Sequence, residues 1–133
     1  MQWLGVLSDA EVASRLAGAT VLCAPSLQGE SFGMVLLEGM AAGCAVVASD
    51  IGGYRRAAGG HATLVPPGDV GALSRALDEV LAQAEAEAGT ASGISSEARK
   101  EATEYARGGS MDTLAGRYVE IYGRAIRAYG ARR

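Results

Sequence analysis

The sequence predicts an α/β fold: a partial Rossmann-like, doubly wound parallel sheet followed by C-terminal helices. Three short apolar runs of strand length, at 20–24, 45–48 and 61–65, alternate with segments whose apolar residues recur at helical spacing. Strands that alternate with helices in this way form a parallel sheet with helices on both faces. Hydrophobic residues make up 49% of the 133 residues and aromatic residues only 5%, so the expected core is aliphatic.

Each predicted element follows from a local signal. The run 2–6 has the length of a short strand, and Ser8 or Asp9 can cap the helix after it. Asp69 follows the turn residues 66–68 and is the expected cap of a long helix. The expected order is a strand at 2–6, a helix through about 17, a strand at 20–24, a helix that follows the Ser31 cap, a strand at 45–48, a short helix around 54–58, a strand at 61–65 and a helix from 70 to about 81. The apolar residues of the helix after Ser31 recur at helical spacing: Met34, Leu37, Met40 and Ala41.

The last third of the chain is expected to be a separate part. Residues 1–82 form the predicted α/β unit, 83–96 read as a frayed helix end or mobile linker, and 97–133 carry two further helices, at 97–106 and 112–129. The last helix has an apolar stripe, which predicts a packed face: Leu114, Tyr118, Ile121, Tyr122, Ala125 and Ile126. Its basic end is expected to be a solvated face, with a membrane-surface role as the alternative: Arg124, Arg127, Arg132 and Arg133.

Composition excludes several function classes. The formal net charge is -3 and the pI is about 5.1, so the chain offers no basic field for nucleic acid. Cys23 and Cys44 lie in or beside apolar runs, which favours buried free thiols and a reducing, cytoplasmic location. The first residues do not resemble a signal peptide, no run approaches the roughly 20 apolar residues of a spanning helix, and no metal-ligand cluster is visible.

The stretch 29–43 is the most informative part of the sequence. It reads as a loop that opens into a helix between two strands, with Ser31 as the expected N-cap. A helix that begins just after a strand directs its free N–H groups at the loop, where an anion such as a phosphate binds. Glu30 and Glu38 would lie roughly 12 Å apart, which suits the two ends of one long ligand such as a nucleotide sugar. On spacing alone, the alternative of two solvated glutamates stays open.

Other catalytic patterns receive little support. His61 is the only histidine and begins a predicted strand, so a structural role is favoured over a catalytic one. The chain has no GxSxG around a serine, no GxGxxG after a strand and no Walker lysine. These absences argue against a serine hydrolase, a dinucleotide enzyme and an ATPase.

An ordered set of motifs resembles a known enzyme family. Glu30 and Glu38, with seven residues between them and 40–43 after them, resemble the E-x7-E signature of retaining glycosyltransferases of the GT-B fold, family 4. Further motifs make the chain most similar to the actinobacterial phosphatidylinositol alpha-mannosyltransferases, from about Trp3 to Leu81: Cys23-Ala24-Pro25, Val47-Ala48-Ser49-Asp50, Tyr54-Arg55-Arg56 and Leu64-Val65-Pro66.

The resemblance implies a role for each matching residue. Glu30 would bond the donor sugar near its reacting carbon and is the implied catalytic residue, while Glu38, next to Val35, would bond the ribose. Asp9 would face the guanine of GDP-mannose, although Val12 replaces a lysine of the family's base pocket. The implied donor sugar and diphosphate ligands are the backbone N–H groups of Ser31, Phe32, Gly33 and Met34. No cofactor beyond the nucleotide-sugar substrate and no metal is implied.

The resemblance also implies a missing half. It begins at the third strand of the family's C-terminal domain, so the N-terminal acceptor domain and two strand–helix units, with their diphosphate-binding Arg and Lys, would come from elsewhere or from a partner chain. In the 3-2-1-4-5-6 strand order the missing strands are central, which predicts a gap or a rearrangement in the sheet. We therefore expect the isolated chain to be inactive and to self-associate.

Two interpretations of function follow. The first is a C-terminal fragment of a retaining glycosyltransferase that uses GDP-mannose and a lipid acceptor such as phosphatidylinositol, in the cytoplasm or at the inner face of the plasma membrane. The alternative is a non-enzymatic nucleotide-sugar-binding or interaction module, arising as a truncated product.

Overall fold

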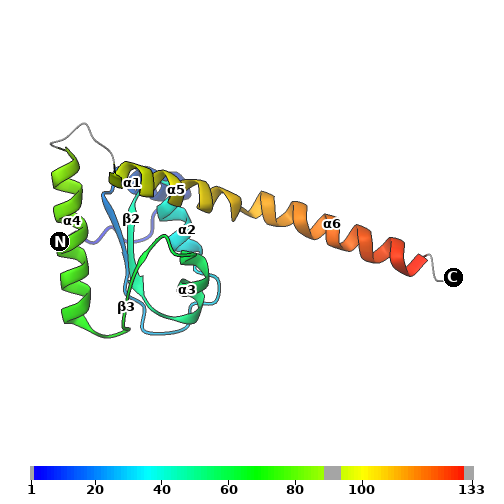
Figure 1. Cartoon of the computed structure of the whole chain (residues 1–133), viewed down its shortest axis with the longest axis horizontal. Coiled ribbons are helices and arrows are strands. Elements are labelled where there is room, and N and C mark those ends of the chain that lie inside the picture. The colour runs from blue at the N-terminus through cyan, green and yellow to red at the C-terminus, as the bar shows by residue number, and fades with distance from the viewer. Residues whose placement is uncertain (1, 89–93, 131–133) are drawn as a thin grey trace.

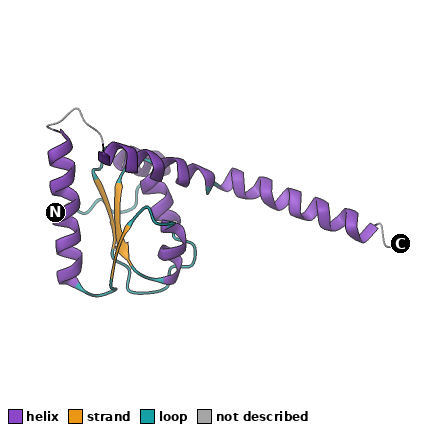
Figure 2. Ribbon diagram, in the orientation of Figure 1, coloured by secondary structure: helices purple, strands orange, loops and turns teal. Residues whose placement is uncertain are grey.

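The computed structural model describes residues 2–88 and 94–130, which form a three-stranded parallel sheet with helices on both faces (Figures 1 and 2). The strands are β1 (Val21–Ala24), β2 (Ala45–Ser49) and β3 (Thr63–Val65), in the order β1-β2-β3. Val21 is paired with Ala45 and Val47 with Thr63. The central strand β2 is buried at all but its first residue, as expected for a strand covered on both faces. The predicted α/β class with a partial Rossmann-like sheet is confirmed.

The helices divide between the two faces of the sheet. Helix α4 covers one face, and α2, α3 and α5 contribute to the core on the other (Figure 1). The bounds are α1 Asp9–Ala17, α2 Met34–Ala41, α3 Gly52–Ala58, α4 Val70–Ala88, α5 Ile94–Gly108 and α6 Met111–Gly130.

The larger core lies under α2. Leu36 and Met40 of this helix are fully buried against the sheet and α5. The Thr103 hydroxyl of α5 donates a hydrogen bond to the Met40 carbonyl at 2.9 Å, which ties the two helices together. Gly39 brings α2 close to β1, because a Cβ at position 39 would lie 2.5 Å from Leu22 Cδ2. Small residues at these contacts therefore set how closely α2 approaches the sheet.

The core on the other face is smaller. Val47 and Val65 from the sheet pack against Ala76 of α4. The Asp69 carboxylate accepts a hydrogen bond from the Ala72 backbone N–H at 2.8 Å, which confirms the predicted cap of this helix. Helix α4 runs to Ala88, past the beginning of the segment 83–96 that was expected to be a frayed end or linker. Part of that segment, 89–93, lies outside the described residues.

Two helices lie at the margins of the molecule. Helix α1 begins with a capping box in which the Glu11 carboxylate accepts hydrogen bonds from the Ser8 backbone N–H at 2.9 Å and hydroxyl at 2.7 Å. Helix α6 extends away from the sheet as a long single helix (Figure 1). No helix in the described part of the chain is long and apolar enough to cross a membrane.

The expected strand at 2–6 is not formed. Residues 2–5 have no regular structure, and the Trp3 side chain is 85% exposed. A strand needs a hydrogen-bonded neighbour, and within the described ranges this segment has none. The sheet accordingly has three strands rather than four, and they are adjacent. The expected gap between strands of this chain is therefore absent, and among the described residues the sheet has two unpaired edges, the outer edges of β1 and β3.

Two smaller predictions are also wrong. The N-cap of α2 is Gly33, with φ 68°, rather than Ser31, because the loop turns sharply through a left-handed residue just before the helix. Cys23 is exposed, since it lies on the edge strand β1, whereas Cys44 is buried as expected. Partial desolvation raises the pKa of the Cys23 thiol, and burial raises the pKa of the Cys44 thiol.

Candidate functional site

The loop that follows β1 carries Glu30 to the amino end of α2. The Glu30 Oε1 atom accepts hydrogen bonds from the backbone N–H groups of Phe32 at 3.2 Å and Gly33 at 2.9 Å. The carboxylate therefore occupies two of the four donors that were expected to hold the sugar and the diphosphate. A ligand oxygen that takes over these N–H groups releases the carboxylate, which then becomes free to accept hydrogen bonds from hydroxyl groups.

The first turn of α2 supplies further donors. The Leu36 N–H bonds the Gly33 carbonyl at 3.0 Å. The N–H groups of Met34 and Val35 belong to the start of the helix, where helical geometry gives them no partner inside the helix. They lie at the positive end of the helix dipole, which favours an anion or a partly negative oxygen. The Val35 side chain is half-buried and packs against the core.

Helix α3 supports the loop from behind. Gly53 allows the Glu30 peptide to lie against α3, since a Cβ there would overlap the Glu30 carbonyl. The Tyr54 hydroxyl lies 3.0 Å from Ser26 Oγ, and Arg56 Nη2 donates a hydrogen bond to the Ser31 carbonyl at 3.2 Å. Tyr54 and Arg56 belong to one of the motifs that carry the family resemblance, but the motif implies no role for either residue. Their contacts join residues 28 and 25 positions apart, which leave no local signal in the sequence.

Asp9 and Glu38 line one groove. It has a volume of about 570 Å³ and lies between α1 and the second half of α2, with Val12, Leu16 and Ala41 also on its walls. The two carboxylates come from segments far apart in the sequence, so the fold joins the predicted base-binding and ribose-binding residues.

Ser31, Phe32 and Met34 line a different groove. It has a volume of about 520 Å³ and lies where the loop and the first half of α2 meet α3 and α5, with Arg56 and Tyr105 beside it. The Phe32 side chain is 79% exposed. The predicted site residues are therefore spread along α2 over two successive grooves rather than gathered in one cavity.

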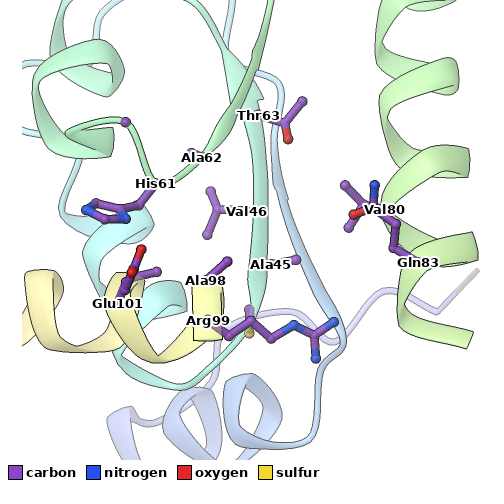
Figure 3. A pocket seen from close by; sticks show the side chains of 13 residues that line it. Ala45, Val46, His61, Ala62, Thr63, Val80, Gln83, Ala98, Arg99 and Glu101 are labelled. Atoms are coloured by element: carbon purple, nitrogen blue, oxygen red, sulfur yellow. The ribbon is translucent and has the colours of Figure 1, made fainter. Parts of the chain in front are cut away.

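A third cavity lies at the opposite end of the sheet. It has a volume of about 320 Å³ and lies beside the first residues of β2 and β3, between α4 and α5, with Ala45, Thr63, Val80 and Arg99 on its walls (Figure 3). His61 also lines it and packs against the Tyr105 ring, with 4.8 Å between the ring centroids. This contact supports the structural role expected for His61.

The charges around the loop are partly paired. Arg55 Nε donates to Asp50 Oδ1 at 2.7 Å, and this hydrogen bond holds the pKa of the Asp50 carboxyl below its usual value. Arg55 is thus paired with Asp50, just before α3, while the neighbouring Arg56 donates a hydrogen bond to the Glu30 loop. Among the described residues, no group of three His, Cys, Asp or Glu side chains is arranged to hold a metal ion.

The family model of the glycosyl transferases group 1 matches residues 1–107. The chain belongs to this glycosyltransferase family. The match includes the Glu30 loop, every strand of the sheet and the groove lined by Asp9 and Glu38. It also includes the walls of the second groove apart from Gly108 and Gly109. The resemblance read from the motifs is therefore confirmed at the level of the family.

Several curated glycosyltransferases are similar in sequence. Phosphatidyl-myo-inositol mannosyltransferase of Mycolicibacterium smegmatis is 47% identical over 91 residues, which cover 67% of this chain and 24% of the relative. The protein of the same name from Mycobacterium leprae is 48% identical over 83 residues, covering 61% of this chain and 22% of the relative. MMP alpha-(1->4)-mannosyltransferase of Mycolicibacterium hassiacum is 42% identical over 78 residues, covering 56% and 19%. The chain thus spans no more than about a quarter of the length of these relatives.

Proposed function

We propose that this glycosyltransferase chain supplies part of a nucleotide-sugar site, and that the donor is GDP-mannose. The relatives carry the names of mannosyltransferases, and two of them are named for phosphatidyl-myo-inositol. A lipid acceptor such as phosphatidylinositol is part of the proposal. The proposal also includes a second, acceptor-binding half that is supplied from outside these 133 residues. It further includes a location at the cytoplasmic face of a membrane.

The convergence of Asp9 and Glu38 in one groove carries this proposal. A nucleoside offers two sets of donors at its ends: the hydroxyls of the ribose and the N–H groups of the base. The Glu38 carboxylate accepts from the ribose diol, and the Asp9 carboxylate accepts from the guanine edge. Uracil offers fewer donors on its edge, so a carboxylate at this place selects guanine.

The amino end of α2 supports the other half of the donor. The N–H groups of Phe32, Gly33 and Met34 hold the sugar and the leaving diphosphate, whose negative charge grows as the bond to the sugar breaks. Glu30 accepts hydrogen bonds from the sugar hydroxyls. The acceptor oxygen forms the new bond to the reacting carbon as the diphosphate departs, and the acceptor's proton passes to the diphosphate.

Titration calorimetry of the 133-residue chain tests the proposal. We expect GDP-mannose to bind more tightly than UDP-glucose, and Asp9→Asn to reduce this preference by about tenfold. Glu38→Gln should weaken both nucleotides, because both contain ribose. Glu79→Gln, an exposed glutamate on α4, is the matched control and should leave both affinities unchanged. Absence of binding to either nucleotide sugar at millimolar concentration would overturn the proposal.

A further inference from the structure

One peptide group in the Glu30 loop is held at both of its ends. The group that joins Ser31 to Phe32 accepts a hydrogen bond from Arg56 Nη2 at its carbonyl, at 3.2 Å. The N–H of the same group donates to Glu30 Oε1, also at 3.2 Å. A peptide group is planar and its C=O and N–H point in opposite directions, so fixing the carbonyl fixes the direction of the N–H.

From this geometry we infer that Arg56 is a positioning residue for the donor end of the site. This inference rests on the proposed function. Arg56 contacts neither Glu30 nor Gly33 through a hydrogen bond in the described structure; it acts through the Ser31–Phe32 peptide. A cation at the carbonyl also polarises the peptide, which makes the Phe32 N–H a stronger donor to the carboxylate or to a ligand oxygen that replaces it.

Contacts between the Glu30 loop and α3 explain why α3 can hold the Ser31–Phe32 peptide group in place. Gly33, at the end of the loop, lies close to α3, since a Cβ there would be 2.6 Å from Ala57 Cβ and 3.1 Å from the Gly53 carbonyl oxygen. The loop thus approaches α3 at Glu30, Ser31 and Gly33, and Arg56 adds the charged contact. The Arg56 side chain also lines the groove beside Ser31 and Phe32, so it is next to the place where a ligand would enter.

The neighbouring arginine provides a natural comparison. Arg55 has the same side chain on the same helix, but it donates to Asp50 rather than to the loop. Loss of Arg55 removes one charge from α3, as does loss of Arg56, yet leaves the Ser31 carbonyl contact in place. Arg55→Gln is therefore the matched control for Arg56→Gln, and Arg56→Lys tests whether a cationic donor alone restores the effect.

The first test needs no ligand. Amide hydrogen exchange followed by NMR on the 133-residue chain should show faster exchange at Phe32 and Gly33 in Arg56→Gln, by about tenfold. The melting temperature should stay close to that of the unaltered chain, and Arg56→Lys should recover much of the protection. Arg55→Gln should leave both amides unchanged. Equal exchange rates in Arg56→Gln and the unaltered chain would overturn the inference, whether or not the chain binds nucleotides.

The second test separates the positioning role from the proposed function. We expect Arg56→Gln to lower the affinity for GDP-mannose by about tenfold while changing that for GMP, which keeps only base, ribose and one phosphate, much less. If the unaltered chain binds neither ligand, the proposed function fails, and the hydrogen-exchange data alone decide whether Arg56 positions the peptide group. If both ligands bind and the ratio of their affinities is unchanged in Arg56→Gln, the inference is wrong and the proposed function stands.

Discussion

Gly53 lies so close to Glu30 that a side chain at position 53 would overlap the Glu30 carbonyl oxygen and stand 2.7 Å from the carbonyl carbon. The partner of this contact is backbone, so it cannot move aside by a change of rotamer. The absence of a Cβ at Gly53 therefore sets the distance between α3 and the loop at the candidate site.

Gly53→Ala should destabilise the chain and displace the loop. Overpacking of this kind costs about 1–3 kcal/mol, because backbone must shift to make room. Thermal unfolding followed by circular dichroism measures the effect. Gly116→Ala is the control, since nothing lies within 4 Å of a Cβ at this position of α6, and there alanine should be neutral or slightly stabilising. Equal melting temperatures for both variants would contradict the predicted contact.

The two glutamates of the E-x7-E motif should affect different kinetic constants in the longer enzyme to which this chain would belong. Glu30→Gln should lower kcat, because in the proposed site this residue lies where charge changes on the sugar during the reaction. Glu38→Gln should mainly raise KM for the donor, because the ribose changes little. Steady-state kinetics with varied donor concentration decides this. The assigned roles fail if both variants change only KM.

The 133-residue chain alone should show no sugar transfer. By the resemblance, the Arg and Lys that neutralise the donor diphosphate would lie outside the part of the family domain that this chain matches, and each such charge is worth several kcal/mol of leaving-group stabilisation. Incubation with radiolabelled GDP-mannose and phosphatidylinositol should therefore give no labelled lipid. Clear turnover would show that the residues present are sufficient.

The chain should self-associate through α6. Apolar side chains on this helix are 51% to 71% exposed and form a continuous stripe: Tyr118, Val119, Ile121, Tyr122, Ile126 and Tyr129. The outer edge of β1 offers a second contact surface. Sedimentation velocity should show species larger than a monomer that increase with concentration. A single monomeric species at high concentration would contradict this.

Point variants can assign the association to α6. Replacing both Tyr122 and Ile126 with lysine should shift the distribution toward monomer. Glu120→Lys, on the polar side of the same helix, adds positive charge without removing apolar surface and should have little effect. If the double variant associates as strongly as the unaltered chain, the β1 edge is the dominant contact.

Acid should loosen the start of α1. The hydrogen bonds from Ser8 hold the pKa of Glu11 below its usual value. A carboxyl with a depressed pKa stabilises the fold above its unfolded pKa, and this contribution is lost as the pH falls through the lower, folded value. The capping box should therefore open only below the pH range in which an unperturbed glutamate carboxyl titrates. NMR titration of the Glu11 carboxyl and the Ser8 amide measures it, and Glu11→Gln should abolish the shared transition.

Local signals predicted most of the elements. The Asp69 cap, the capping residue Ser8 and the apolar runs at β1, β2 and β3 are all visible within a few residues of sequence. The predicted strand at 2–6 was wrong because a strand needs a hydrogen-bonded neighbouring strand, and the local pattern does not show whether one is present. The N-cap of α2 was wrong for a related reason: the sharp approach to α3 requires the left-handed Gly33 and moves the helix start past Ser31.

The site was predictable only in part. The E-x7-E motif identified Glu30 and Glu38, and the resemblance added Asp9. The meeting of Asp9 with Glu38 in one groove depends on how α1 packs beside α2, which no spacing in the sequence encodes. The hydrogen bonds of Glu30 to its own loop and of Arg56 to Ser31 depend on backbone geometry and tertiary contact. Their existence required the structure.

The order of the strands in space is also their order along the chain, so each can pair with its neighbour soon after leaving the ribosome. The contact between α5 and α2 is different, because Thr103 and Met40 are 63 residues apart. Until α5 has been synthesised, the side of α2 that it covers stays open to water. A nascent chain that has completed β3 but not α5 is therefore the intermediate most exposed to misfolding, and the one for which a chaperone would matter most.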